Sequence, residues 1–131
     1  MTPVRQEIFE DGKGDCLRAC VASILDLPTG AVPNFIEETP VGVLDVAREW
    51  LEARGKKTVL VLIEGPAKLY VGHDDSPVIL TGESPRVNGA GTPKQHAVVG
   101  MPDGFGFRMV HDPHPSNAGL VGSPDVVLWI L

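Results

Sequence analysis

The sequence predicts an α+β domain whose N-terminal helices pack on a largely antiparallel sheet. Two segments with apolar residues at helical spacing come first, and five short segments rich in valine, leucine and isoleucine follow. Helices followed by a run of strands are typical of the α+β class. The chain has 131 residues, the length of one domain, so we expect residues 1–131 to form a single domain.

The first helix is predicted over residues 16–25. Asp15 is a favourable N-cap for it, and Pro28 and Gly30 are expected to end it. Two cysteines four residues apart in one helix seldom suit a disulfide, so we expect free thiols. The apolar face of this helix consists of Leu17, Cys20, Val21, Ile24 and Leu25.

A second helix is predicted to open at Thr39, as cap, and Pro40, as first helical residue. Gly55 is its stop signal, and residues 33–38 are expected to form a linker before it. The buried stripe of this helix is predicted to be Leu44, Ala47, Trp50 and Leu51.

Five strands are predicted in the remaining chain. The first, residues 58–63, is apolar throughout and is expected to be buried on both faces. Met101-Pro102-Asp103-Gly104, between the third and fourth strands, is a hairpin turn signal. The predicted strands are Thr58–Ile63, Pro77–Thr81, His96–Gly100, Phe107–His111 and Val126–Ile130.

Charge and hydropathy narrow the expected partners and location. Lys and Arg number 11 against 17 Asp and Glu, a net charge of −6, which argues against a nucleic-acid partner. The longest mostly apolar runs have six residues, against about 20 for a membrane span, so no membrane partner is expected. The N-terminus lacks the apolar stretch of a signal peptide, and together with the free thiols this predicts a cytoplasmic protein.

Cys16 is placed where a nucleophilic cysteine is expected. In the first turn of a helix, unpaired backbone N–H groups and the helix dipole stabilise a thiolate and lower the pKa of the thiol. The preceding Gly12-Lys13-Gly14 leaves room for a substrate carbonyl, and the N–H groups could contribute to an oxyanion hole. The alternative is that Cys16 is a small buried apolar residue, as is expected for Cys20.

His96 and Asp112 are expected to meet through the predicted hairpin. His96 opens one of its strands, and Asp112 directly follows the other, held in an extended conformation by Pro113. A carboxylate beside the imidazole would fix its orientation and tautomer, as in a Cys-His-Asp triad. The alternatives are a structural histidine and a turn aspartate.

Three motifs together resemble those of papain-like cysteine peptidases. The resemblance covers nearly the whole chain and is greatest to the compact leader-peptide peptidase domains attached to bacteriocin exporters. The wider pattern is also similar to that of small uncharacterised bacteriophage proteins. The motifs are Gly14-Asp15-Cys16-Leu17-Arg18-Ala19-Cys20, Gln95-His96-Ala97-Val98-Val99 and His111-Asp112-Pro113.

The resemblance implies a papain-like fold with Cys16 as nucleophile, His96 as general base and acid, and Asp112 as its orienting residue. In those peptidases a glutamine upstream of the cysteine completes the oxyanion hole. Gln6 is the only upstream glutamine, further from Cys16 than usual, and a turn at residues 10–14 would absorb the difference. The implied activity is cleavage or transfer of an amide or thioester acyl group of a peptide or small acyl substrate, without a cofactor, in the cytoplasm (of the host, if the chain is phage-encoded).

Two further residues are candidates for substrate binding. Arg86, in Ser84-Pro85-Arg86, would bind a substrate carboxylate or phosphate bidentately. His114, in the proline-rich loop after Asp112, is expected to line the site.

Two other functions are alternatives to an enzyme. The fold could serve as a catalytically silent binding or inhibitory module. His111, Asp112 and His114 with Cys16 or Cys20 could suggest zinc, but paired CxxC or HxxxH spacings are absent and no metal is expected. The sequence leaves open the acyl group, its acceptor, hydrolysis against transfer, the biological process and the oligomeric state.

Overall fold

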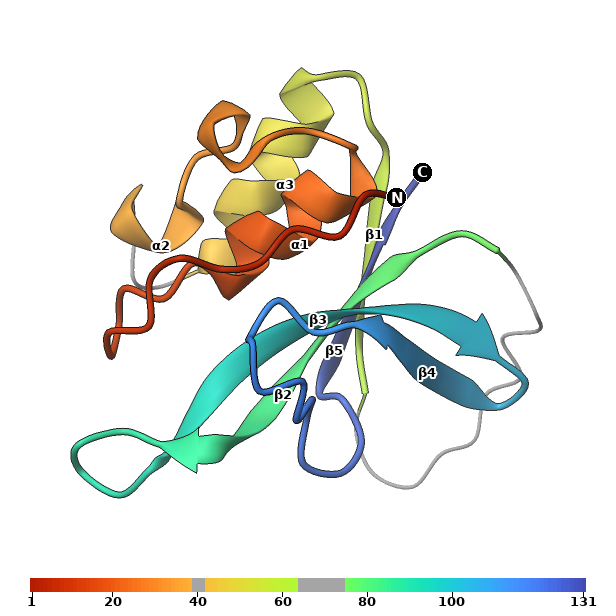
Figure 1. Cartoon of the computed structure of the whole chain (residues 1–131). Helices are drawn as coiled ribbons and strands as arrows, with labels where there is room; N and C mark the ends of the chain where they lie inside the picture. Colours follow the sequence, from red (N-terminus) through yellow and green to blue (C-terminus); the bar gives the residue numbers. More distant parts are fainter. Residues whose placement is uncertain (39–41, 64–74) are drawn as a thin grey trace.

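The computed structural model describes residues 1–38, 42–63 and 75–131, with the backbone alone for residues 37 and 38 (Figure 1). Helices come first and strands follow, which confirms the predicted α+β class. The helical part consists of α1 (Cys16–Ile24), the 3₁₀ turn η1 (Thr29–Ala31), α2 (Phe35–Glu38) and α3 (Val43–Ala53). The strands are β1 (Thr58–Leu62), β2 (Val78–Val87), β3 (Pro93–Asp103), β4 (Gly106–His111) and β5 (Val126–Ile130).

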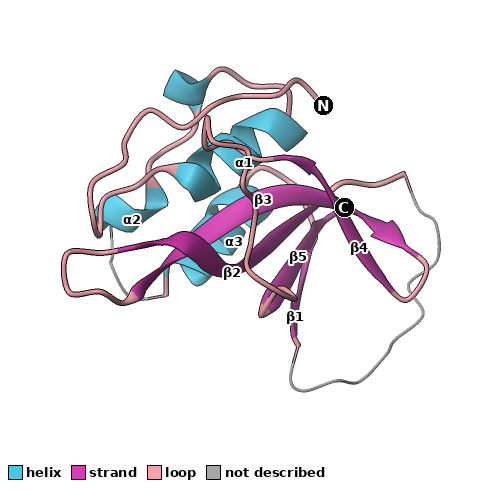
Figure 2. Ribbon diagram, turned by 60° about the horizontal axis from the view of Figure 1, so that its bottom comes forward, coloured by secondary structure: helices cyan, strands magenta, loops and turns pink. Residues whose placement is uncertain are grey.

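The strands form one sheet in the order β1-β5-β2-β3-β4, and every neighbouring pair is antiparallel. The helices lie on one side of this sheet (Figure 2), and α1 packs against β3. The N-terminal segment runs alongside α1 (Figure 1), where the backbone N–H groups of Thr2 and Val4 donate to Ser23. The N-terminal segment and β3 therefore both pack against α1.

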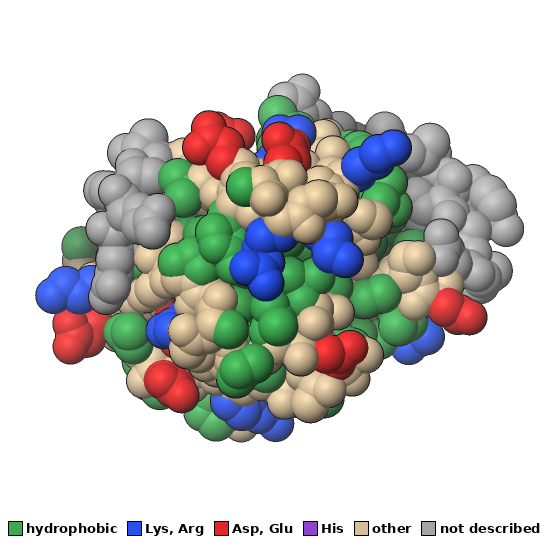
Figure 3. All heavy atoms as spheres, turned by 90° about the horizontal axis from the view of Figure 1, so that it is seen from above, with side chains coloured by type: hydrophobic (Ala, Val, Ile, Leu, Met, Phe, Trp, Pro, Cys, Tyr) green, Lys and Arg blue, Asp and Glu red, His purple; other side chains and the backbone are tan. Residues whose placement is uncertain are grey.

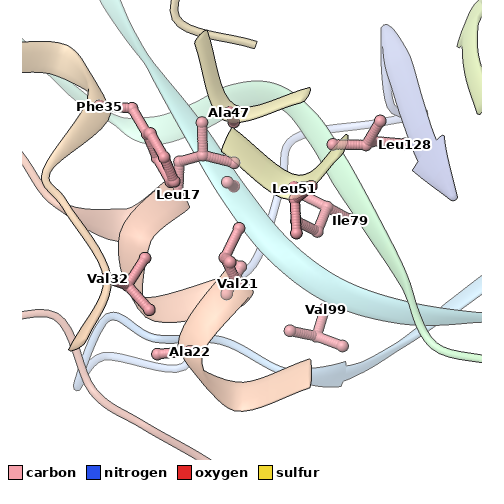
Figure 4. Packing of buried hydrophobic residues seen from close by; sticks show 12 residues of the cluster. Leu17, Val21, Ala22, Val32, Phe35, Ala47, Leu51, Ile79, Val99 and Leu128 are labelled. Carbon is pink, nitrogen blue, oxygen red and sulfur yellow. The ribbon is translucent and has the colours of Figure 1, made fainter. Parts of the chain in front are cut away.

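The main hydrophobic core fills the space between the helices and the sheet (Figure 4). Side chains alternate along a strand, so the central strands present a second set of apolar residues to the opposite face. The main core includes Leu17, Val21, Val32, Phe35, Ala47, Leu51, Ile79, Val99 and Leu128. The smaller cluster on the opposite face consists of Val78, Leu80, Val98 and Val127, partly covered by Phe107, Leu120 and Trp129.

The expectation that residues 58–63 are buried on both faces is wrong. β1 lies at the edge of the described sheet, and Val59 is 45% exposed and Leu62 64% exposed. The strands buried on both faces are β2, β3 and β5. The valines and leucines of β1 reflect strand propensity more than burial.

Both longer helices end at a residue in the left-handed conformation. The N–H groups of this residue and of the one after it then donate to carbonyls of the last helical turn. In α3 this residue is Gly55 (φ 80°), as predicted, and the N–H groups of Gly55 and Lys56 make the two bonds. In α1 the left-handed residue is Asp26 (φ 54°). The first helix thus ends before Pro28 and Gly30, which were expected to stop it.

Two predicted boundaries between the helices differ from the structure. Residues 33–38, expected to be a linker, contain α2. This short helix is anchored by the fully buried Phe35, whose ring meets that of Trp50 edge-on, with centroids 5.9 Å apart. Thr39 and Pro40, the predicted start of the second helix, lie outside the described residues.

The β3–β4 hairpin is longer than predicted. Asp103 pairs with Gly106, so the chain turns at residues 104 and 105 and not at 101–104. The pairing register shifts between Val99 and Gly100, where β4 has one extra residue. A second irregularity interrupts the β2–β3 pairing between Glu83 and Val87. Such bulges bend a strand and redirect its side chains.

The helical side of the molecule carries charges of both signs. Figure 3 shows apolar side chains across its middle, lysine and arginine side chains among them, and acidic side chains nearer the edge. Among the side chains described on this face, the lysines and arginines do not form one continuous patch. Among the described residues, no helix is both long enough and apolar enough to cross a membrane.

Gly100 provides a test of the tight packing at the β3–β4 register shift. A Cβ atom at this position would lie 2.5 Å from Leu80 Cδ1 and 3.0 Å from the carbonyl oxygen of Arg108. We expect Gly100→Ala to lower the free energy of unfolding by about 1–3 kcal/mol, because overpacking displaces its neighbours. Urea denaturation measures this loss. Gly106→Ala is the control, since a Cβ there would meet nothing within 4 Å, and equal losses in the two variants would contradict the prediction.

Candidate active site

A buried histidine–aspartate pair lies where β3 runs beside the end of β4. Val99 pairs with His111, so Asp112 leaves the sheet next to β3 and its side chain reaches His96. His96 Nε2 and Asp112 Oδ1 are 2.7 Å apart, and the two residues are 5% and 0% exposed. The hairpin thus brings together the two residues that the sequence singled out.

The Asp112 carboxylate has hydrogen-bond donors on both oxygens. Besides His96, the backbone N–H of His114 donates to Oδ1 over 2.9 Å and that of Gly119 donates to Oδ2 over 2.8 Å. Burial by itself would raise the pKa of Asp112, but these hydrogen bonds outweigh it and the pKa lies below its ordinary value. The carboxylate is therefore ionised at neutral pH and only accepts hydrogen bonds.

The His96 imidazole is held neutral with a defined tautomer. Burial lowers its pKa below the ordinary histidine value and the positive charge of Arg86 adds to this, although Asp112 acts in the opposite direction. Because Asp112 can only accept, the proton of the neutral ring is on Nε2. Nδ1 is left unprotonated, as a base nitrogen must be.

Arg5 stabilises the loop that carries Asp112. Its Nη1 donates to the carbonyl oxygens of Asp112 and His114 over 2.8 and 3.1 Å. These partners lie 107 and 109 residues later in the sequence, and both are backbone groups. No residue pattern could have indicated this role for Arg5.

Cys16 is the first residue of α1 and is partly exposed. Desolvation by the surrounding protein raises the pKa of its thiol, and the charge of Asp15 adds to this. The backbone N–H groups of Ala97 and Leu17 act in the opposite direction, without prevailing. The Cys16 sulfur therefore lies next to the backbone of Ala97, the residue after His96. The expectation of a lowered thiol pKa is wrong for the protein without substrate, because burial outweighs the helix start.

Asp15 precedes α1, but its side chain does not cap the helix. Its Oδ1 accepts hydrogen bonds from the backbone N–H groups of Glu7 and Ile8, each over 2.9 Å. Oδ2 is buried without a hydrogen-bond partner among the described residues. The predicted cap bond is absent because the N-terminal segment supplies these donors. Asp15 therefore ties residues 7 and 8 to the start of the cysteine helix.

Gln6 lies beside the same cleft. Its Nε2 donates to the carbonyl of Ile8 over 3.0 Å, and its backbone N–H donates to Pro113 over 3.0 Å. The chain turns at residues 10–13, inside the segment where a turn was expected, and this shortens the path to Cys16. Within the described part of the chain, the second hydrogen of the Gln6 amide has no partner.

Two pockets meet at Cys16 and His96. The larger has a volume of about 450 Å³ and the smaller about 340 Å³, and both are lined by these two residues. A bound molecule can therefore extend from the sulfur in two directions. Polar and charged residues of the larger pocket include Gln6, Ser84, Arg86, Lys94 and His114. Apolar residues of the smaller pocket include Leu17, Ile36, Val43, Leu44 and Ala97.

Arg86 and His114, the two candidates for substrate binding, both line the larger pocket together with His96. The His114 ring lies edge-on to that of His96, with centroids 6.2 Å apart. Burial lowers the pKa of His114, and the positive charge of Arg86 lowers it further. Both candidates thus line the same pocket as His96.

The remaining metal-ligand candidates have other partners. His111 Nε2 donates to the carbonyl of Val4 over 2.7 Å, which holds the N-terminal segment on β4. Cys20 is fully buried in the main core, and burial raises the pKa of its thiol. In the described ranges, no group of three or more His, Cys, Asp and Glu is arranged to hold a metal ion. The zinc alternative therefore gains no support from this part of the chain.

Comparison with protein-family models, curated proteins and solved structures found no match to this chain. Its function has to be inferred from the residues and geometry of the site itself.

Replacing Asp112 tests the coupling between the two buried side chains. Asp112 holds the pKa of His96 up, so in Asp112→Asn we expect burial to lower that pKa further. A pH titration of the imidazole C–H signals by NMR measures the change. An unshifted His111 signal would show that the fold is retained. A His96 pKa that stays constant or rises would contradict the arrangement.

The raised thiol pKa predicts how Cys16 responds to pH. Iodoacetamide reacts with the thiolate, so we expect the alkylation rate to rise with pH to beyond the ordinary thiol pKa of about 8.5. Mass spectrometry of the labelled protein measures the rate, and Cys20→Ser is the control because Cys20 is fully buried. A fast, constant rate between about pH 5 and 7 would instead indicate a preformed thiolate–imidazolium pair.

Proposed function

We propose that this chain is a papain-like cysteine hydrolase or acyltransferase that acts on an amide or thioester bond. The observation that carries the proposal is a neutral His96, oriented by an ionised buried Asp112, in the same pocket as Cys16 at a helix start. A nucleophile, a base and a group that orients the base are what covalent acyl transfer requires.

The order and placement of these residues support the papain-like assignment. The cysteine begins a helix, the histidine lies on a strand against which that helix packs, and the aspartate follows the next strand of the hairpin. Gln6 comes before the cysteine and lines the cleft beside it. This arrangement agrees with the motifs in which the sequence resembles papain-like peptidases.

The proposed reaction begins from a neutral thiol and a neutral imidazole. Cys16 Sγ attacks the substrate carbonyl carbon while its proton passes to His96 Nδ1, and the carbonyl π electrons move onto oxygen. The resulting oxyanion accepts hydrogen bonds from backbone N–H groups at the start of α1 and from the free hydrogen of the Gln6 amide. When the bond to the leaving group breaks, His96 returns the proton to the leaving nitrogen or sulfur.

The second half of the reaction releases the acyl group. Water, or an acceptor amine in a transferase, attacks the thioester carbonyl while His96 takes its proton. The C–S bond breaks and the proton returns to Cys16. Asp112 stays ionised throughout and stabilises the imidazolium that forms in each half.

We propose that the chain acts in the cytoplasm on a peptide or a small acyl compound. Both cysteines are free thiols, which fits a reducing compartment. The open cleft of two pockets can receive an extended substrate on both sides of the sulfur.

Acylation by p-nitrophenyl acetate tests the proposed nucleophile without knowledge of the natural substrate. We expect an initial burst of one equivalent of p-nitrophenol, followed by slower release as the acyl group is hydrolysed, with one acetyl group on the peptide containing Cys16 at the end of the burst. Cys16→Ser should abolish acylation while keeping the fold. Asp112→Asn should slow it by at least about tenfold but by less than the roughly 10⁴-fold loss of serine triads.

Cys20→Ser is the matched control. We expect it to lower the free energy of unfolding by about 1–3 kcal/mol, because a hydroxyl would be buried without a hydrogen-bond partner. Acetylation of Cys16 should stay intact. Equal acetylation of wild type and Cys16→Ser would refute Cys16 as the nucleophile. A folded wild-type protein that is never acetylated would refute the enzyme and favour the binding or inhibitory module.

A further inference from the structure

The guanidinium of Arg86 differs from the other charged groups of the larger pocket because no carboxylate of a described side chain neutralises it. Within residues 1–36, 42–63 and 75–131, it forms one hydrogen bond, from Nη1 to Ser116 Oγ over 3.2 Å, and no ion pair. A guanidinium has five N–H donors in a planar fork that matches carboxylate and phosphate oxygens. The half-buried Arg86 side chain therefore retains most of its donors for a ligand.

The other charged side chains of this pocket are compensated. Lys94 pairs with Asp11 over 2.7 Å, and Glu10 pairs with Lys13 over 3.6 Å. In the described part of the pocket, Arg86 is thus the charge that lacks a counter-ion. A partly desolvated cation of this kind favours binding of an anion.

A strand irregularity places Arg86 in the pocket. Between the pairs Glu83–Gln95 and Val87–Pro93, β2 has three residues where β3 has one. In this bulge Pro85 has no N–H to donate, and the N–H of Arg86 donates to Ser84 Oγ over 3.1 Å instead of to the partner strand. A bulge next to a cleft redirects a side chain at the expense of regular pairing, which is consistent with a ligand-binding role for Arg86.

His114 supplies a second donor beside Arg86. Its Nδ1 accepts the backbone N–H of Ser116 over 3.0 Å and lies 2.8 Å from Ser116 Oγ. Since a backbone N–H can only donate, Nδ1 is unprotonated and the proton of the neutral ring is on Nε2. That N–H has no hydrogen-bond partner among the described residues. Ser116 thereby fixes both Arg86 and His114 through one hydroxyl group.

We propose that Arg86 and His114 bind a small oxyanion, a carboxylate or phosphate group, in the larger pocket next to Cys16. The substrate class is then an acyl compound with an anionic group on this side of the reacting carbonyl and an apolar group in the smaller pocket. The role as a substrate subsite rests on the proposed function, whereas anion binding by Arg86 does not require catalysis.

Two maleimides that differ in charge test the site. N-Ethylmaleimide is neutral, whereas N-(2-carboxyethyl)maleimide carries a carboxylate, and both add to a thiol by the same reaction. Rates at Cys16, each divided by the rate with free cysteine, are measured by mass spectrometry at pH 8. We expect the anionic reagent to be favoured by roughly tenfold, as for one hydrogen bond to a charged group.

Arg86→Gln should abolish this preference, and Arg86→Lys should retain part of it because it keeps the charge but not the fork. Arg108→Gln is the matched control. This substitution removes the same charge, and Arg108 is an exposed residue of β4 that does not line the pocket. If Arg86→Gln and Arg108→Gln lost the preference for the anionic reagent equally, the preference would depend only on the net charge of the protein, and the proposal would be overturned.

Anion binding is also measured directly in Cys16→Ser, which cannot react. Inorganic phosphate and propionate are titrated separately while NMR records the Arg86 Nε–H and His114 signals. Saturable shifts with one of the two anions, lost in Cys16→Ser/Arg86→Gln, support the site and identify the anion chemistry. Saturable shifts without any acylation of the wild type would uphold the anion site and reject the enzyme. Absence of shifts with both anions would overturn the anion site, even if Cys16 is acylated.

Discussion

The buried carboxylate of Asp112 is the interaction on which the geometry of the cleft depends. A fully buried carboxylate is tolerated only when hydrogen bonds replace the water it has lost. Here the donors are His96, from the neighbouring strand, and the backbone N–H groups of His114 and Gly119, from the following loop. One charge therefore fixes a side chain and the course of a loop, and Arg5 holds the same loop from outside.

The same burial sets the protonation of the proposed nucleophile and base. Desolvation raises the pKa of Cys16 and lowers that of His96, so both groups are neutral in the free protein. A charged pair would gain attraction, but the loss of hydration opposes it in a site without substrate. In the proposed mechanism the proton moves as the sulfur attacks. Backbone N–H groups near Cys16 then stabilise charge only when it develops.

Departures from regular structure are concentrated around the cleft. The β3–β4 register shifts at Gly100, shortly before His111 and Asp112, and the β2–β3 pairing is interrupted where Arg86 enters the larger pocket. The Asp15 side chain binds backbone N–H groups of the N-terminal segment instead of capping α1. The two register shifts interrupt regular pairing near residues of the site, and Asp15 gives up a helix-cap bond to hold the backbone of residues 7 and 8. Local rules fail in this way most often where side chains are positioned for binding or chemistry.

The sequence by itself determined the class of fold and the meeting of His96 with Asp112. Apolar periodicity separates helices from strands, and a short turn between two strands leaves little freedom in how they pair. Only the tertiary structure decided that β1 is an edge strand, that Arg5 and Asp15 hold backbone groups, and that burial raises the pKa of Cys16. These outcomes depend on desolvation and on partners distant in the chain. A local sequence pattern predicts only the conformation that neighbouring residues favour.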